Sequence, residues 1–258
     1  MSECGGLEVM IQRLSLIKDL SARSRPLLLV LLKLFAHCIK VKKNRQRLID
    51  PSLKEVISVL LNTLKMAILA DTQDLASGSS SSLGKTNVLE LLLTIIEKIL
   101  SEAAKQSNQE YDIFCDHSCT TKEDIKFFLN CANSENVRNN TNIMHLLMRL
   151  IPHLTLNDKQ KMLTVLEHFN RHLNFNKFDF ENTQEDHFQI DCFCVLLDGI
   201  VKNENGNRFK DLIVQEKIVD NAIEYLKLHA PPVKSAVLAT SEEWKVFTQK
   251  PALKYVLR

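Results

Sequence analysis

The stretch NENGNRFKDLIVQEKIVDNAIEYLKLH, residues 203–229, decides the fold. Its first half spaces Phe209, Leu212 and Ile213 as i, i+3 and i+4, which predicts a short helix with one apolar face. Its second half predicts a longer amphipathic helix. The apolar stripe of that helix comprises Ile218, Val219, Ala222, Ile223 and Leu226. Two helices of unequal length cannot bury both stripes alone, so the stretch predicts neighbours that are built in the same way.

A second copy of this pattern lies near the N-terminus. Asn-Arg, then Leu-Ile, a connector and a long amphipathic helix occur at both 44–64 and 207–228, and a long helix is predicted before each copy, at 27–43 and 188–202. Further amphipathic helices are predicted at 7–20, 88–99, 125–129, 143–151 and 157–169. Alternating short and long helices at a spacing of about 40 residues predict an all-α fold, an armadillo- or HEAT-like α-solenoid.

Serine-rich and polar stretches divide the helical pattern. The predicted domains are helical repeats at 1–70, a serine-rich linker at 71–85 and helical repeats at 86–258, with loops at 104–120 and 174–186. Pro251 suits the first turn of a last helix, which ends at Arg258 with its apolar residues unpaired. We therefore expect a truncated chain.

The composition is typical of a helical protein inside the cell. The chain has only 6 glycines and 6 prolines, and 33 basic against 31 acidic residues give a net charge of +2, which favours neither a nucleic-acid surface nor an acidic tail. Seven irregularly spaced cysteines favour reduced thiols over a disulfide framework. The chain does not begin with a secretory signal, and its most apolar run, 27–39, is shorter than the ~20 residues that span a bilayer. We expect a protein of the cytoplasm, and also of the nucleus, with no membrane span.

Two stretches partly match motifs for ligands. Residues 78–86 end in Gly-Lys-Thr, but five residues rather than four separate the glycines and no strand precedes them, which favours a linker over a phosphate-binding loop. Cys115, His117 and Cys119, with Cys131 beyond, are four possible zinc ligands. Neither pair has the spacing of a zinc knuckle, so free thiols are the favoured interpretation.

No other group of residues predicts catalysis or metal binding. Cys192 and Cys194 are two apart on a predicted helix, so they point in different directions and are interpreted as small core residues. His168 and His172 share a helical face, but no third ligand is placed by the sequence, which favours exposed or capping roles. No Ser/His/Asp, Cys/His or paired-carboxylate arrangement stands out. The sequence thus assigns no catalytic, cofactor-binding or metal residue.

The remaining candidate is a basic cluster at the end of the first long helix. Its members are Lys40, Lys42, Lys43, Arg45 and Arg47. As cations at a helix end they would favour the negative end of the helix dipole. As exposed charges they would form a binding surface for an acidic partner or for phosphates. The sequence leaves both interpretations open.

Six short motifs occur in the order in which they occur in a known family. They are ECGGLE at 3–8, LLKLF at 31–35, KVKKNRQ at 40–46, DCFC at 191–194, KDLI at 210–213 and PAL at 251–253. In this order they resemble the C-terminal region of giant UBR-type E3 ubiquitin ligases, a family that includes insect purity of essence and plant BIG. The resemblance runs from Glu3 to Arg258 and is weaker in 70–140, which also argues against a zinc site there.

The resemblance implies an armadillo-type scaffold just upstream of the ligase's zinc-binding, RING-like module. The cysteine and histidine clusters of that module, and those of the UBR box that reads destabilising N-termini, have no counterpart in this sequence. Zinc is therefore expected only in the downstream module, and no functional residue of the family is carried over. Ubiquitin-conjugating enzyme and substrates would be reached through the full-length ligase. Met1 would be an internal methionine or the start of a partial gene model.

Three functions from different classes follow. The first is a noncatalytic scaffold segment of such a ligase, which supports substrate ubiquitination through protein partners. The second is a stand-alone helical-repeat adaptor that binds an extended or acidic peptide with help from the basic cluster. The third is a zinc-dependent enzyme, which would contain stoichiometric metal. The ordered motifs favour the first, in which the chain resembles part of an enzyme but lacks the catalytic module.

Overall fold

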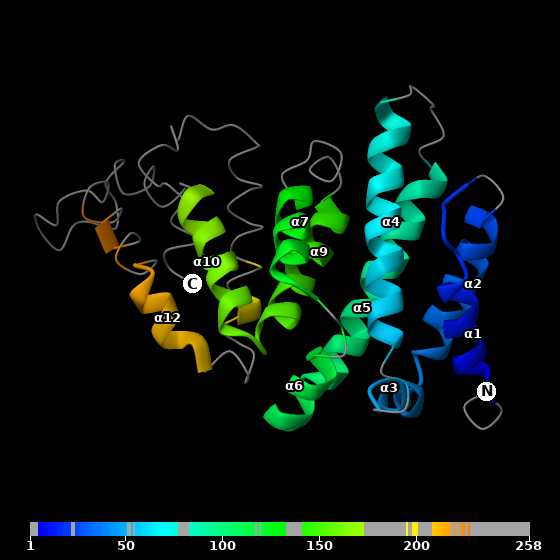
Figure 1. Cartoon of the computed structure of the whole chain (residues 1–258), viewed down its shortest axis with the longest axis horizontal. Coiled ribbons are helices and arrows are strands. Elements are labelled where there is room, and N and C mark those ends of the chain that lie inside the picture. The colour runs from blue at the N-terminus through cyan, green and yellow to red at the C-terminus, as the bar shows by residue number, and fades with distance from the viewer. Residues whose placement is uncertain are drawn as a thin grey trace, which may run out of the picture. The chain divides into compact units, whose positions relative to one another are not determined.

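The chain folds into α-helices that are joined by turns (Figure 1). The computed structural model describes residues 5–21, 24–50, 53, 55–76, 83–116, 118, 120–132, 141–172, 195, 198–200, 208–217, 220, 223, 224 and 227. Over these residues there is no strand. The chain divides into two compact units, Met1–Asn157 and Asp158–Arg258. The predicted all-α, solenoid-like helical fold is confirmed.

Unit 1 is organised around one long central helix, α5. Its helices are α1 (Gly6–Ser15), α2 (Ser24–Cys38), α3 (Lys42–Leu48), α4 (Val56–Ala76), α5 (Leu83–Ala103), α6 (Asn108–Asp116), α7 (Lys122–Ala132) and α9 (Thr141–Thr155). Helix α5 packs against α2, α3, α4, α6 and α9, while α1 packs on α2 and α4, and α7 packs on α9. Within this unit α1 and α2 lie at one end, and α7 and α9 lie at the other (Figure 1).

The central place of α5 follows from its sequence. Apolar side chains occupy most of its circumference, so burial requires neighbours on several sides. Its buried side chains are Val88, Leu89, Leu92, Leu93, Ile95, Ile96, Ile99 and Leu100. Each large apolar side chain that leaves water stabilises the fold by about 1.5–3 kcal/mol. The core of unit 1 therefore lies along this helix.

The loop predicted at 104–120 is wrong over its middle part, because that part forms α6. Ser107 and Glu110 form a capping box: the Ser107 amide donates to Glu110 Oε2 at 3.1 Å, and the Glu110 amide donates to Ser107 Oγ at 3.4 Å. Tyr111, Phe114 and Cys115 follow on one buried face. The polar composition of the segment concealed a short amphipathic helix with a defined start.

The helix predicted at 143–151 does not end before Pro152. Helix α9 includes Pro152 and ends at Thr155. The proline lacks one backbone donor, but Leu154 and Leu156 beyond it are buried, and burial of this type outweighs a weak helix former. The Thr155 hydroxyl donates to the Pro152 carbonyl at 3.0 Å and helps to end the helix.

Unit 2 contains α10 (Lys159–His172) and α12 (Lys210–Gln215). The Asp158 carboxylate accepts the amides of Gln160 and Lys161 at 2.6 and 3.2 Å, which starts α10 at the predicted place. Helix α12 is the short helix predicted in 203–229, and the three side chains that define its apolar face are buried.

Several predictions fall wholly or partly outside the described residues. Of the predicted linker 71–85, residues 71–76 end α4 and 83–85 begin α5, while 77–82 are not described. The loop 174–186, most of the helix at 188–202 and the last helix at 251–258 lie outside as well. Among the described helices none has both the length and the apolar character that a membrane span requires. The division into domains therefore stays a prediction.

Candidate partner-binding surface at the α2–α3 corner

The predicted basic cluster lies where α2 ends and α3 begins. After Cys38 the chain makes a tight turn in which the amides of Lys40 and Val41 donate to carbonyls of His37 and Cys38, at 3.2 and 3.3 Å. Val41 then takes an extended conformation (φ −78°, ψ 122°) immediately before α3. The turn needs no glycine, because neither residue has a positive φ. It places the cations of the cluster around the C-terminal end of α2.

Two side chains of α3 satisfy carbonyls at the end of α2 and in the turn that follows it. Asn44 Nδ2 donates to the Cys38 carbonyl at 2.8 Å. Arg45 Nη1 donates to the carbonyls of Ile39 and Lys40 at 2.8 and 3.1 Å. Carbonyls at a helix C-terminus have no partner within the helix, and a cation there also favours the helix dipole. Arg45 thus has the structural role that the sequence allowed.

Arg45 also joins α3 to the central helix. Its Nε donates to Glu102 Oε2 at 3.1 Å, and Lys105 Nζ reaches the same oxygen at 3.3 Å. Glu102 is 3% exposed. Burial raises the pKa of Glu102, but the hydrogen bonds from Arg45 and Lys105 outweigh burial and leave the pKa below its ordinary value. The carboxylate is therefore ionised and holds the end of α5 to α3.

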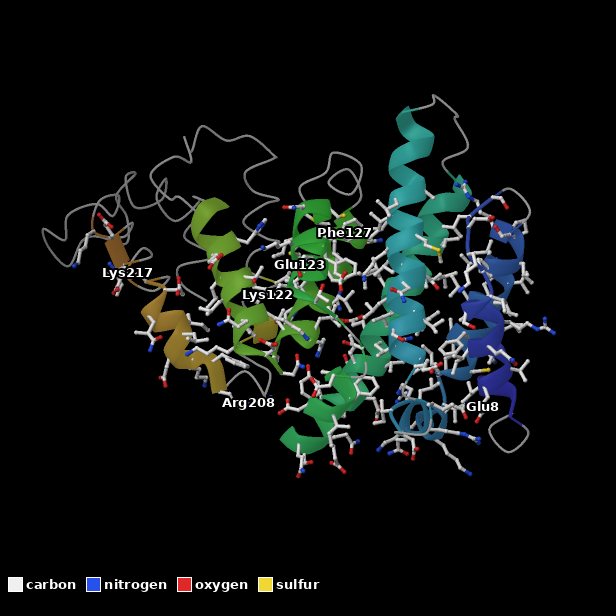
Figure 2. The ribbon with its side chains drawn as sticks, viewed as in Figure 1. Glu8, Lys122, Glu123, Phe127, Arg208 and Lys217 are labelled. Atoms are coloured by element: carbon white, nitrogen blue, oxygen red, sulfur yellow. The ribbon has the colours of Figure 1, made fainter. Side chains whose placement is uncertain are left out.

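Arg47 forms a second internal ion pair, with Glu8 of α1. Figure 2 shows Glu8 on α1, on the side of unit 1 where α3 lies. Both side chains are about one-third exposed. The pair fixes α1 to α3 across 39 residues of sequence. Arg47 is therefore another structural member of the cluster.

The three lysines of the cluster have a different environment. Lys40, Lys42 and Lys43 are all exposed to solvent. They follow one another around the turn, so their positive charges share one region of the surface. The structure thus separates the five predicted residues into two arginines that hold helices together and three lysines that face solvent. The exposed lysines are placed to meet a partner directly.

Sequence analysis missed a row of exposed apolar side chains on α2. Leu27 and Val30 are each 54% exposed, and Leu34 is 48% exposed. Apolar residues occur on nearly all sides of α2, a pattern that is typical of a helix buried between others. The described neighbours cover only one side, and Lys33 and His37 are exposed next to the apolar row. Helical spacing identifies this second face, but it does not reveal which face the neighbours cover.

A groove lies between α1 and the start of α4. It has a volume of about 380 Å³, and Ile11 and Val59 lie in its lining. Two carboxylates, Glu8 and Glu55, also line it. Since Glu8 is already paired with Arg47, its charge is largely balanced within the fold.

The candidate zinc ligands are only partly described. Cys115 is buried, and its thiol donates weakly to the His153 carbonyl at 3.6 Å. Burial raises the pKa of the Cys131 thiol to about 11. Within the described part of the chain no group of three or more metal-ligating side chains occurs. His117, Cys119, Cys192 and Cys194 lie outside that part, as does the side chain of His172.

The fold and this surface define an all-α helical-repeat domain with exposed cations at one helical corner. The whole chain, residues 1–258, matches the family model described as the E3 ubiquitin-protein ligase UBR4 TPR-like domain. The chain therefore belongs to this family. Tetratricopeptide, armadillo and HEAT repeats are all stacks of amphipathic helices, which agrees with the helical-repeat fold that the sequence predicted.

The relatives are giant proteins. The protein purity of essence of Drosophila pseudoobscura pseudoobscura is 37% identical over 261 residues, which cover 100% of this chain and 5% of that relative. A probable E3 ubiquitin-protein ligase of Dictyostelium discoideum is 30% identical over all of this chain and 4% of its own length. The auxin transport protein BIG of Oryza sativa subsp. japonica is 23% identical over 99% of this chain and 5% of its own length.

These matches confirm the resemblance to the giant UBR-type family. The chain spans about a twentieth of the length of these relatives. No solved structure gives a significant match.

Proposed function

We propose that the chain is a noncatalytic scaffold segment of a giant UBR-type E3 ubiquitin-protein ligase and supports the ubiquitination of substrates in the cytoplasm and the nucleus. The observation that carries the proposal is the family match over all 258 residues, with relatives that are ligases or their kin. The charged groups of unit 1 agree with such a role, because many of them connect helices instead of converging on a reactive centre.

Ion pairs between helices support the idea of a rigid platform. Lys65 of α4 pairs with Asp124 of α7 at 2.6 Å, and Arg149 of α9 pairs with Glu97 of α5 at 3.1 Å. With the Arg45–Glu102 pair, they link helices that are far apart in the sequence. A domain of this type holds attached modules and bound partners at fixed positions. Each component is then present near the others at a high effective concentration.

Within this function, we assign the binding of acidic protein partners to Lys40, Lys42 and Lys43. Exposed lysines attract acidic surfaces over about a Debye length and accelerate association. Substrates and the ubiquitin-conjugating enzyme would meet the full-length ligase. The same surface would serve a stand-alone helical-repeat adaptor, which is the second candidate function.

Excision of this region from the full-length ligase tests the proposal. In a reconstituted reaction, the excised ligase should still discharge ubiquitin from a charged conjugating enzyme, because the catalytic module is untouched. Its ubiquitination of substrate should fall at least tenfold, because substrate and catalytic module are no longer held together. The isolated chain, added to the conjugating enzyme alone, is the matched control and should not accelerate discharge.

Two results would contradict the scaffold. Unchanged substrate ubiquitination after excision would mean that the region supports nothing in the reaction. Faster discharge in the presence of the isolated chain would mean that the region is itself catalytic.

A further inference from the structure

Helix α2 has two apolar faces that differ in their surroundings. Leu28, Leu32 and Phe35 face the core and are 0% exposed. Leu27, Val30 and Leu34 form the outer face of α2, and each has about half of its surface open to solvent. Large apolar side chains that gather on one exposed face are characteristic of interaction surfaces, whereas single exposed ones are ordinary. The outer face therefore requires an explanation beyond stability.

The spacing of the outer face suits a helical partner. Leu27, Val30 and Leu34 are separated by three and then four residues, so they form one row over two turns, about 10 Å along the helix. A partner helix that packs against such a row inserts its own side chains between these residues. An extended peptide would instead need a sheet edge or a groove for its backbone.

Lysines border the same row. Lys33 of α2 lies next to it, Lys40 follows in the turn and Lys42 begins α3; all three are exposed. Between Asp19 and Asp50 the sequence contains eight lysines and arginines and neither aspartate nor glutamate. Glu102 and Glu8 pair with Arg45 and Arg47, but they do not meet Lys33, Lys40 or Lys42. The outer face is thus apolar in its centre and positive at its border.

We propose that the outer face of α2 binds an amphipathic helix of a separate protein, whose apolar stripe is flanked by Asp or Glu. The proposal rests on the scaffold function and specifies the partner of its basic surface. Apolar anchors within a charged border are the usual anatomy of an interface between proteins that also exist apart. The helix-to-helix contacts inside unit 1 are different. Apart from the ion pairs of Glu97 and Glu102, α5 makes them with apolar side chains that are nearly inaccessible to solvent.

Charge also argues against a second copy of this chain on the same face. In a symmetric dimer the outer faces of two α2 helices would meet, and their lysines would lie opposite like charges, which costs stability. An acidic helix removes that cost and gains charge-assisted contacts. Its association would be fast at low salt and slower as salt screens the charges.

Synthetic helical peptides test this chemistry with the whole 258-residue chain. One set of probes carries leucines at helical spacing between glutamates, and a matched set carries the same leucines between lysines. We expect fluorescence anisotropy to detect the glutamate set with at least tenfold higher affinity than the lysine set. The affinity should fall as salt increases, because the attraction is electrostatic.

Two double variants locate the binding face. Lys33→Glu with Leu34→Ser should lower the affinity at least tenfold, because it reverses one border charge and removes one anchor. Lys126→Glu with Ile113→Ser changes an exposed lysine and a 44% exposed isoleucine elsewhere in unit 1 and should leave the affinity within twofold. Unfolding by urea should be the same for both, which excludes loss of the fold as the cause.

Other results would overturn the proposal. An acidic helix would be excluded as the partner by any of three results: equal binding of the lysine set, no binding of either set, or binding that is unchanged in the α2 double variant. Dimerisation in sedimentation that the α2 variant abolishes would assign the face to a second copy. In the full-length ligase without partners, hydroxyl-radical footprinting that finds Leu27, Val30 and Leu34 protected would assign it to another part of the same polypeptide. If excision abolishes substrate ubiquitination while the α2 variant does not, the result supports the scaffold function and contradicts the proposed binding of a partner helix.

Discussion

The inner and outer faces of α2 contain similar apolar residues, but they differ in solvent exposure and in the residues around them. On the inner face Leu32 and Phe35 lose all contact with solvent, because α2 packs on α5 and α1. On the outer face Val30 and Leu34 keep about half of their exposure and have Lys33 between them. The same residue types therefore hold the fold on one side and form a candidate binding surface on the other.

The largest expected effect separates the two faces directly. Phe35→Ala should lower the free energy of unfolding by about 3–5 kcal/mol, because it leaves a cavity at a fully buried position. Leu34→Ala, at the preceding residue, should change this free energy by less than about 0.5 kcal/mol. Urea unfolding of the isolated chain measures both. Equal losses would mean that the outer face also belongs to the core.

A second comparison lies within the basic cluster. Arg45→Met should cost about 3 kcal/mol, because Glu102 would keep only Lys105 as a partner while it stays buried. Lys42→Met removes an exposed cation and should cost less than about 0.5 kcal/mol. The urea midpoints of the two variants provide the test. A neutral Arg45→Met would show that the arginine is as dispensable for folding as the lysine.

The pH dependence of stability should report His153, a half-buried histidine. Burial lowers the pKa of His153 from the ordinary 6.5 to about 4. Below pH 6.5 His153 is protonated in the unfolded chain, whereas in the folded chain it stays neutral until the pH approaches 4. The free energy of unfolding therefore decreases as the pH falls from 6.5 to 4. The loss between pH 7 and pH 5 should be about 2 kcal/mol.

His153→Leu is the control for this prediction. It replaces the ionisable imidazole by an apolar side chain in the same space. The free energy of unfolding should then change little between pH 7 and pH 5. A variant with the unchanged slope would assign the pH dependence to another group. The carboxylates of Glu102 and Asp124, whose pKa values are lowered, lose their contributions only at lower pH.

A smaller effect is expected where α7 begins. The Asp124 carboxylate accepts the Thr121 amide at 2.8 Å and pairs with Lys65 of α4. Asp124→Ala should cost about 1 kcal/mol, because it removes half of a capping box and one partly exposed ion pair. Glu123→Ala, at the exposed neighbour that Figure 2 labels, should cost no more than a few tenths of a kcal/mol. Thermal unfolding of the two variants distinguishes these outcomes.

Periodic apolar residues allowed much of the fold to be predicted. The helices over 88–99 and 143–151, and the short helix with Phe209, Leu212 and Ile213, occur where spacing placed them. The prediction was wrong where composition and local pattern disagreed. The polar stretch 104–120 contains the capping box of Ser107 and Glu110, a local pattern that is readable but was outweighed by composition.

The candidate surface was predictable only in part. Charge spacing identified the five basic residues, but Arg45 takes its role from Glu102, which lies 57 residues away in the sequence. No local pattern contains that pairing. The outer face of α2 was missed for the same reason, since the side of an apolar helix that neighbours cover depends on how the other helices stack.

Methyl NMR of the chain, titrated with the glutamate-flanked helical probe, tests the central claim most directly. The signals of Leu27, Val30 and Leu34 should shift in a saturable manner, and those of Leu28 and Leu32 on the inner face should not. Shifts that map to another part of the chain, or outer-face signals that stay unchanged while the probe binds, would contradict the assignment of this face to a partner helix.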